Sequence, residues 1–219
     1  MNQIQDVANM KTLNSSLFSG IQETLSELPT VLEERKEVLQ PLIQFIQKKL
    51  DNKEVINLNF ICTHNSRRSH LSQIWAQTMA FYYQTPNVHS YSGGTETIAT
   101  NVTVVDTLLD NGFRIQQLSN ETNPVYAIKY ADNVPSIIGF SKKYDNEFNP
   151  TSAFCAIMTC SQADEGCPFI AGAEKRVPVT YEDPKLYDGT PSEKQKYLER
   201  SLQIAAEMQY VFSRVKISL

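Results

Sequence analysis

A cysteine, an arginine and a serine stand close together in the segment C-T-H-N-S-R-R-S, residues 62–69. Residues 55–62 are β-branched and apolar and predict a buried strand, whereas residues 70–83 predict a helix. In open parallel sheets, ligands bind beyond the carboxyl ends of the strands. The start of a helix also offers unpaired N–H groups and the positive end of its dipole. We therefore expect an anion-binding loop between Cys62 and Arg68.

The side chains of this loop suit nucleophilic chemistry on a tetrahedral oxyanion. Arg68 offers a planar fork of donors, and the same positive field favours the thiolate of Cys62, which is the nucleophilic form. The Ser69 hydroxyl would donate to the sulfur, and Asn65 tolerates the left-handed backbone of a tight loop. The alternative is a buried strand-end cysteine beside a solvated arginine. The residues expected to surround the anion are Thr63, His64, Asn65, Ser66, Arg67 and Ser69.

A second pair of thiols, Cys160 and Cys167, is separated by six polar or small residues, which we expect to form a mobile loop. Cys160 ends a predicted strand at 153–160, so it should reach the same sheet edge as Cys62. Three converging thiols suit a disulfide relay, provided that the bonded Cα atoms come within about 7 Å. Two other interpretations stay open: a structural zinc site completed by His64, and buried inert cysteines.

Strands alternate with helices along the chain, which predicts an α/β fold with a parallel sheet covered on both sides. We divide the chain into an N-terminal helical extension, residues 1–53, and a catalytic domain, residues 54–219. Residues 119–150 mix Asn, Ser, Pro and Tyr and are expected to be an irregular insertion. The other predicted elements are strands at 88–92 and 176–180 and helices at 31–50, 102–111 and 192–216.

Composition excludes several classes of function. The 219 residues hold 20 Lys plus Arg against 24 Asp plus Glu, a net charge of −4, which argues against nucleic-acid binding. No apolar run approaches the roughly 20 residues that span a bilayer. The first residues lack the apolar core of a secretory signal, so we expect a cytoplasmic chain with reduced thiols.

The pattern C-x5-R-S, placed between a buried strand and a helix, resembles the low-molecular-weight protein tyrosine phosphatases and their relatives, the thioredoxin-coupled arsenate reductases. The resemblance covers about residues 54–216. It implies a phosphatase I-like, three-layer fold, in which helices flank a four-stranded parallel sheet, and an enzyme without a metal or cofactor. Two positions depart from the family: His64 replaces a usual glycine, and Arg67 replaces a cysteine common in arsenate reductases.

The pattern C-x6-C-P at Cys160 and Cys167 resembles the arsenate reductase branch in particular. That resemblance implies that Cys62 attacks arsenate and that Cys160 then attacks Cys62. Cys167 would next attack Cys160, and thioredoxin would reduce the resulting disulfide. The alternative function is phosphomonoester hydrolysis by a tyrosine phosphatase, and a third class is a non-catalytic oxyanion or zinc module.

The segment Y-E-D-P, residues 181–184, resembles the family's general-acid loop. The resemblance implies that Asp183 protonates the departing oxygen, a usual task for a carboxyl group, with Glu182 as a weaker candidate. Phosphatases often carry an aromatic residue directly after D-P, where this chain has Lys185 and Leu186. This difference favours arsenate over phosphotyrosine.

Overall fold

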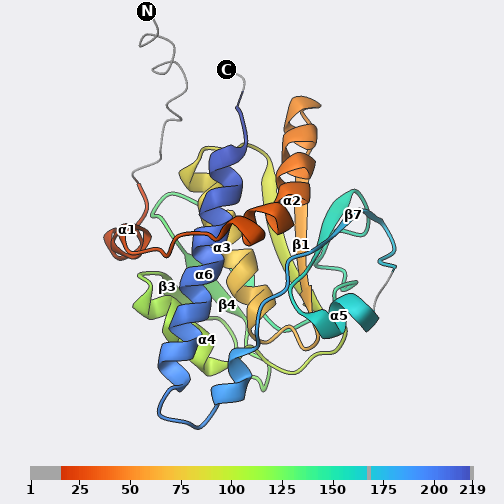
Figure 1. The fold of residues 1–219 in the computed structure, drawn as a ribbon. Helices are drawn as coiled ribbons and strands as arrows, with labels where there is room; N and C mark the ends of the chain where they lie inside the picture. Colours follow the sequence, from red (N-terminus) through yellow and green to blue (C-terminus); the bar gives the residue numbers. More distant parts are fainter. Residues whose placement is uncertain (1–15, 167–168, 218–219) are drawn as a thin grey trace, which may run out of the picture.

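The computed structural model describes residues 16–166 and 169–217. Four strands form a parallel sheet in the order β2-β1-β6-β7, with helices packed on it, which confirms the predicted α/β fold class (Figure 1). The strands are β1 (Ile56–Cys62), β2 (Val88–Gly94), β6 (Phe154–Met158) and β7 (Ala173–Pro178).

The alternation of side chains along the central strands separates two hydrophobic clusters. Leu58 and Phe60 of β1 belong to the larger cluster, whereas Ile61 belongs to a smaller one on the opposite face, together with Met158. All of β6 is buried, as expected for a strand covered on both faces. Because β1 pairs in parallel with β2 and β6, Cys62 lies opposite Gly94 and beside the end of β6.

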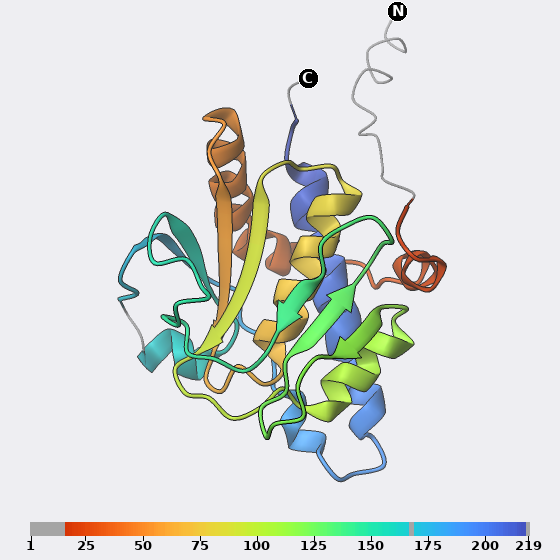
Figure 2. The same cartoon turned by 180° about the vertical axis from the view of Figure 1, so that it is seen from behind.

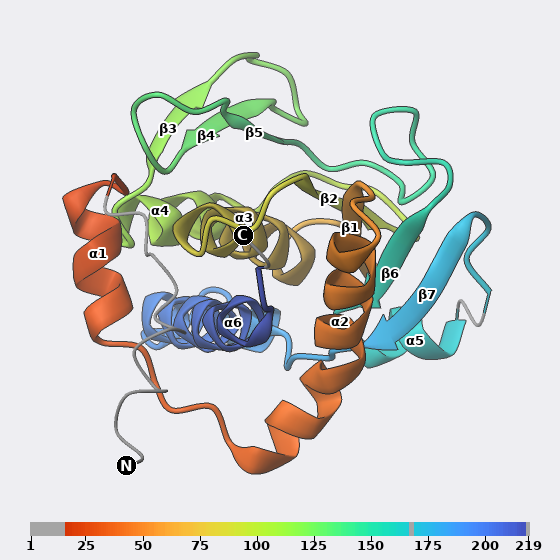
Figure 3. The ribbon, with the colours of Figure 1, turned by 90° about the horizontal axis from the view of Figure 1, so that it is seen from above.

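The helices are α1 (Ser19–Ser26), α2 (Glu33–Asp51), α3 (Arg68–Tyr82), α4 (Val102–Asp110), α5 (Ser161–Gly166) and α6 (Glu193–Arg214). The predicted helices at 31–50, 70–83, 102–111 and 192–216 are therefore confirmed to within a few residues. Figure 3 shows α3 stacked on α6, with α2 against the same side of the sheet. The long apolar face of α6 thus joins the crossover helix α3 to the N-terminal helix α2.

A second sheet corrects the expectation for residues 119–150. Strands β3 (Arg114–Gln117), β4 (Tyr126–Lys129) and β5 (Ile137–Gly139) form an antiparallel sheet, so this region is not wholly irregular (Figure 2). The sheet lies across α3 and α4 from α6 (Figure 3). Its strands hold only three or four residues each, too few to show a clear alternation in the sequence.

The N-terminal extension shares its core with the rest of the described chain. Leu39, Leu42 and Ile46 of α2 are fully buried and belong to the same cluster as β1, α3 and α6. Phe18 N donates to Tyr130 O, which joins the start of the described chain to the second sheet. The amphipathic pattern at 31–50 therefore serves packing within the chain.

Shortening the fully buried Ile46 to alanine should destabilise the whole chain by about 2–5 kcal/mol. The exposed Leu32, with 60% of its surface accessible, gives the matched control Leu32→Ala, for which we expect a change of at most about 0.5 kcal/mol. Urea unfolding of the full chain measures both. A separate transition for the extension, with the main transition unmoved in Ile46→Ala, would show that the extension folds independently.

Candidate active site at the carboxyl edge of the parallel sheet

The loop between β1 and α3 connects Cys62 to Arg68. Asn65 has a φ of 44°, which confirms the left-handed conformation predicted for it. Arg67 stands at the N-cap of α3 without a side-chain cap. Within the described chain, no hydrogen bond uses the backbone N–H groups of residues 63–67. These donors are available to an anion, and the positive end of the α3 dipole adds to their field.

Asn65 fixes the loop and also orients the Ser69 hydroxyl. Its Nδ2 donates to Ser69 Oγ over 2.9 Å, and Ser69 Oγ lies 3.0 Å from Cys62 Sγ. Since the hydroxyl oxygen accepts from Asn65, its own proton is free to be donated to the sulfur. A hydroxyl donor at this position would favour a thiolate, which remains the prediction made for Ser69.

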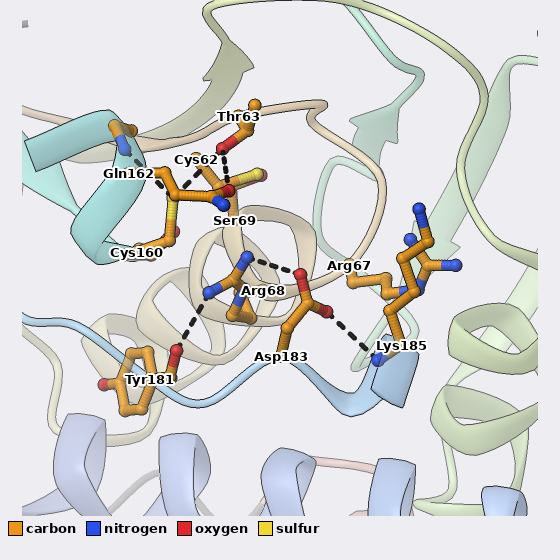
Figure 4. A network of polar contacts seen from close by, with 12 residues as sticks. Cys62, Thr63, Arg67, Arg68, Ser69, Cys160, Gln162, Tyr181, Asp183 and Lys185 are labelled. Carbon is orange, nitrogen blue, oxygen red and sulfur yellow. Dashed lines mark hydrogen bonds and ion pairs between the residues drawn. The ribbon is translucent and has the colours of Figure 1, made fainter. Parts of the chain in front are cut away.

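Arg68 is held by the loop that follows β7. Its Nη1 donates to Tyr181 O over 2.9 Å, and its Nη2 pairs with Asp183 Oδ2 at 2.6 Å (Figure 4). Asp183 also accepts from Lys185 N and thereby caps the N-terminus of a short 3-10 helix, Pro184–Tyr187. The structure therefore brings Asp183 against the guanidinium, and an oxyanion in the loop would compete with this carboxylate for Arg68.

Cys160 lies against the loop that carries Cys62. Its Sγ is 3.4 Å from Thr63 Oγ1 and accepts a hydrogen bond from Ala163 N (Figure 4). Cys62, Cys155 and Cys160 are buried free thiols. Cys155 lies in mid-strand, where burial raises the pKa of its thiol, as expected of an inert cysteine. Cys167 lies outside the described residues.

The segment after Cys160 was expected to be a mobile loop, but residues 161–166 form the helix α5. Two interactions hold it. Asp164 pairs with Arg176 of β7 at 2.5 Å, and Ala163 is buried in the smaller cluster. Arg176 and most residues of the smaller cluster lie far from α5 in the sequence. The polar composition of 161–166 therefore suggested a mobile loop, because the contacts that order it are not local.

Arg67 and His64 differ from the positions they were expected to take around the anion. The Arg67 guanidinium pairs with Asp188 at 2.6 Å and donates to Tyr197 OH. Burial lowers the pKa of Arg67, but Tyr197 and Asp188 outweigh it and raise the pKa overall. This leaves only the Arg67 backbone N–H for the loop. His64 Nε2 lies 3.4 Å from Glu96, and its φ is not positive, so no glycine is needed there.

Three residues that the sequence did not indicate hold the loop from outside. Ser141 Oγ donates to His64 O over 3.0 Å, Lys142 N donates to Asn65 Oδ1 over 2.9 Å, and Gly94 N donates to Lys142 O. A Cβ on Gly94 would lie only 2.7 Å from Asn65 N, so only glycine lets β2 approach the loop. None of the three carried a local signal for this role in the sequence.

Lys142 is a buried cation beside the loop, with 2% of its surface exposed. Its Nζ lies 4.4 Å from the Phe140 ring centroid and 5.3 Å from that of Phe148. Burial lowers the pKa of Lys142 to about 7. Burial, together with the nearby Lys142 charge, lowers the pKa of His70 to about 3, and Asn65 O only partly opposes this. His70 is therefore a neutral structural partner of the loop at physiological pH.

Comparisons with known proteins give similarity only to solved structures. No protein-family model matches the sequence, and no curated protein is significantly similar to it. An arsenate reductase from Archaeoglobus fulgidus is similar over 71% of this chain and 98% of its own, with 16% identity and a TM-score of 0.44. A low-molecular-weight phosphotyrosine phosphatase from Vibrio cholerae O395 is similar over 71% of this chain and 93% of its own, with 12% identity and a TM-score of 0.46.

A thioredoxin-dependent arsenate reductase from Corynebacterium glutamicum is similar over 90% of this chain and 84% of its own, with 16% identity and a TM-score of 0.40. The similar structures thus include both kinds of enzyme that the C-x5-R-S pattern resembles. Because their identities and TM-scores are low, function is inferred from the site itself. Between residues 16 and 217, outside the gap at 167–168, no group of three His, Cys, Asp or Glu residues is placed to hold a metal ion, and no helix is long and apolar enough to cross a membrane.

The lowered pKa of Lys142 predicts a pH-dependent stability. Between pH 7 and about 10.4 the unfolded chain keeps a proton on this lysine that the folded chain has lost, so the free energy of unfolding rises with pH in that window. Lys142→Met has no proton to lose at this position. Its free energy of unfolding should therefore exceed that of the wild type by roughly 4 kcal/mol at pH 7, and this difference should vanish near pH 10. Urea unfolding at several pH values measures it, with the exposed Lys143→Met as control. Parallel curves for wild type and Lys142→Met would contradict the assignment.

Proposed function

We propose that this chain is an arsenate reductase in which Cys62 is the nucleophile of an oxyanion loop. The observation that carries the proposal is the position of Cys62 Sγ, 3.0 Å from Ser69 Oγ at the N-terminal end of α3. The free loop amides and the guanidinium of Arg68 supply donors for a tetrahedral dianion. A cytoplasmic location would keep the thiols reduced between turnovers.

In the first step, the Cys62 thiolate attacks arsenic and forms a sulfur–arsenic bond. One arsenic–oxygen bond breaks, and the departing oxygen takes a proton from Asp183 in its acid form and leaves as water. The contact of Asp183 with Arg68 supports this role, since the carboxyl group touches the residue that we propose as the oxyanion donor. Arrival of the dianion draws Arg68 towards the loop and frees the Asp183 carboxylate, which takes up a proton from solvent before it acts as the acid.

In the second step, the Cys160 thiolate attacks Cys62. A disulfide forms, the sulfur–arsenic bond breaks, and its electron pair reduces arsenic(V) to arsenic(III), which leaves as arsenite. The contact of Cys160 with Thr63 supports this step, because it places the second thiol against the loop that carries the first.

In the third step, Cys167 attacks Cys160 and releases Cys62 as a thiol, and thioredoxin reduces the Cys160–Cys167 disulfide. Six helical residues advance by roughly 9 Å, whereas disulfide-bonded Cα atoms lie within about 7 Å. The relay therefore requires α5 (Ser161–Gly166) to unwind. The helix α5 is short and polar, and the contacts described for it are those of Asp164 with Arg176 and of the buried Ala163, so little has to break when it opens.

The alternative function is hydrolysis of a phosphate monoester such as phosphotyrosine. One observation favours it: Leu186, with 79% of its surface exposed, and the partly exposed Tyr187 follow Asp183 at the site. They offer an apolar surface to a phenyl ring. The deciding experiment supplies the purified chain with arsenate, thioredoxin, thioredoxin reductase and NADPH, in parallel with p-nitrophenyl phosphate. Arsenate-dependent NADPH oxidation supports the reductase, and hydrolysis alone supports the phosphatase.

Two variants test the nucleophile and the oxyanion donor under either function. Cys62→Ser should abolish both activities, because a hydroxyl is a far poorer nucleophile at neutral pH. Arg68→Lys keeps the charge but loses the planar fork, and we expect a rate loss of roughly 10²–10³. Steady-state kinetics measure both, with Cys155→Ala and the exposed Arg114→Lys as controls that should stay near the wild-type rate. A wild-type rate in Arg68→Lys would show that Arg68 is a structural residue and not the oxyanion donor.

The relay predicts different failures for its two thiols. Cys160→Ser leaves the Cys62 adduct unresolved, so turnover stops after one covalent event. Cys167→Ser still allows the first exchange, so it should reduce about one arsenate per chain and stall as a Cys62–Cys160 disulfide. Non-reducing peptide mapping after arsenate treatment detects this linkage. If Cys167→Ser turns over with thioredoxin like the wild type, or no Cys62–Cys160 peptide forms, the relay is wrong and the phosphatase takes its place.

A further inference from the structure

One residue of the N-terminal extension contacts the backbone that leads into Asp183. Arg35 of α2 directs Nε and Nη2 at the carboxylate of Glu207, each over 2.8 Å, and its Nη1 donates to Thr180 O over 3.2 Å. Glu207 lies on α6 and is only 2% exposed. Arg35 lies outside residues 54–216, the part of the chain that resembles the phosphatase family.

Tyr181 connects this ion pair to the oxyanion loop. Its hydroxyl donates to Glu207 Oε2 over 2.8 Å, and the Arg35 guanidinium lies over its ring, 5.2 Å from the centroid. Burial, followed by the charge of Glu207, raises the pKa of Tyr181, so the hydroxyl remains a donor. The backbone of the same residue accepts from Arg68 Nη1. Figure 4 shows the Tyr181 carbonyl facing Arg68 and the ring turned away from it.

The loop beyond Tyr181 has few other attachments before Asp183, whereas further along Pro184 is buried and Asp188 is held by Arg67 and Tyr197. Glu182 is largely exposed and meets Arg200 at 3.2 Å, and the side chains of Lys185 and Leu186 face solvent. A catalytic side chain on a loosely held loop must give up conformational freedom to reach its working position. If that side chain lies about 1 Å away from this position, the reaction rate can fall roughly 10²-fold. Anchoring the two residues before Glu182 limits where Asp183 and the Tyr181 carbonyl can lie.

We propose that Arg35 and Glu207 are positioning residues, through which the N-terminal extension fixes Thr180 and Tyr181 and thereby orients Arg68 and Asp183. The inference rests on the proposed function for its rate readout. It assigns to α2 a task beyond covering the core: the site is incomplete without a residue from the extension. Arg35 touches no reacting atom and acts only through Tyr181 and the Thr180 carbonyl.

The test compares Arg35→Met with Lys49→Met in the full chain. Lys49 is a suitable control because it is a buried cation on the same helix and forms its own ion pairs with the half-exposed Glu54 and Glu174, away from Tyr181. Removing Arg35 should lower kcat by roughly 10- to 100-fold at temperatures where both variants are folded, whereas Lys49→Met should keep the wild-type kcat. Tyr181→Phe, which loses only the hydroxyl link to Glu207, should lower kcat by a smaller factor.

Equal kcat values for Arg35→Met and Lys49→Met, with a wild-type kcat in Tyr181→Phe, overturn the inference. If Arg35→Met does not fold, Tyr181→Phe decides: reduced kcat supports the inference and wild-type kcat overturns it. Protection of Cys62 from iodoacetamide by inorganic phosphate separates this result from failure of the proposed function. A wild type that binds phosphate but neither reduces arsenate nor hydrolyses the ester overturns the function, and phosphate affinity in the same three variants then decides the positioning. A wild type that binds no phosphate overturns both.

Discussion

The left-handed turn at Asn65 is the constraint on which the site depends. It lies between the end of β1 and the start of α3, where the Cys62 sulfur meets Ser69 in the first turn of the helix. The Asn65 side chain is committed on both of its polar atoms, to Ser69 Oγ and to Lys142 N. The backbone of a loop held in this way can stay in place while the Arg68 side chain moves, and such preorganised donors give strong electrostatic stabilisation.

Buried charge surrounds this loop and makes the arrangement specific. Glu207 is compensated by Arg35 and Tyr181, and Arg67 by Asp188 and Tyr197, so each buried ion has several hydrogen bonds. A buried ion pair adds little net stability, because desolvation offsets its attraction, but breaking it is costly. Such pairs therefore fix which of several similar packings the chain adopts. In this structure they fix where the loops after β1 and β7 meet.

The two regions that extend the four-stranded core both end at the site. Ser141 and Lys142, which follow the antiparallel sheet, hold the oxyanion loop through His64 O and Asn65 Oδ1. The helix α2 holds the opposite loop through Thr180 O. Two of these contacts are made to backbone carbonyls, and the third joins a backbone N–H to the Asn65 side chain. The additions therefore hold both loops from outside and leave the sulfur and the guanidinium free for the chemistry that we propose.

The sequence by itself determined the strand, loop and helix around Cys62, because these elements are contiguous and each depends on local periodicity and residue type. It also predicted that Cys160 reaches the same edge as Cys62, since parallel strands end together. Only the tertiary structure decided that the Arg67 side chain turns to Asp188, that 161–166 is helical, and that residues 126–139 form strands. The contacts of Arg35, Ser141 and Lys142 join residues 77 to 172 positions apart. No local pattern records such contacts, because they arise only when the packed core brings distant segments together.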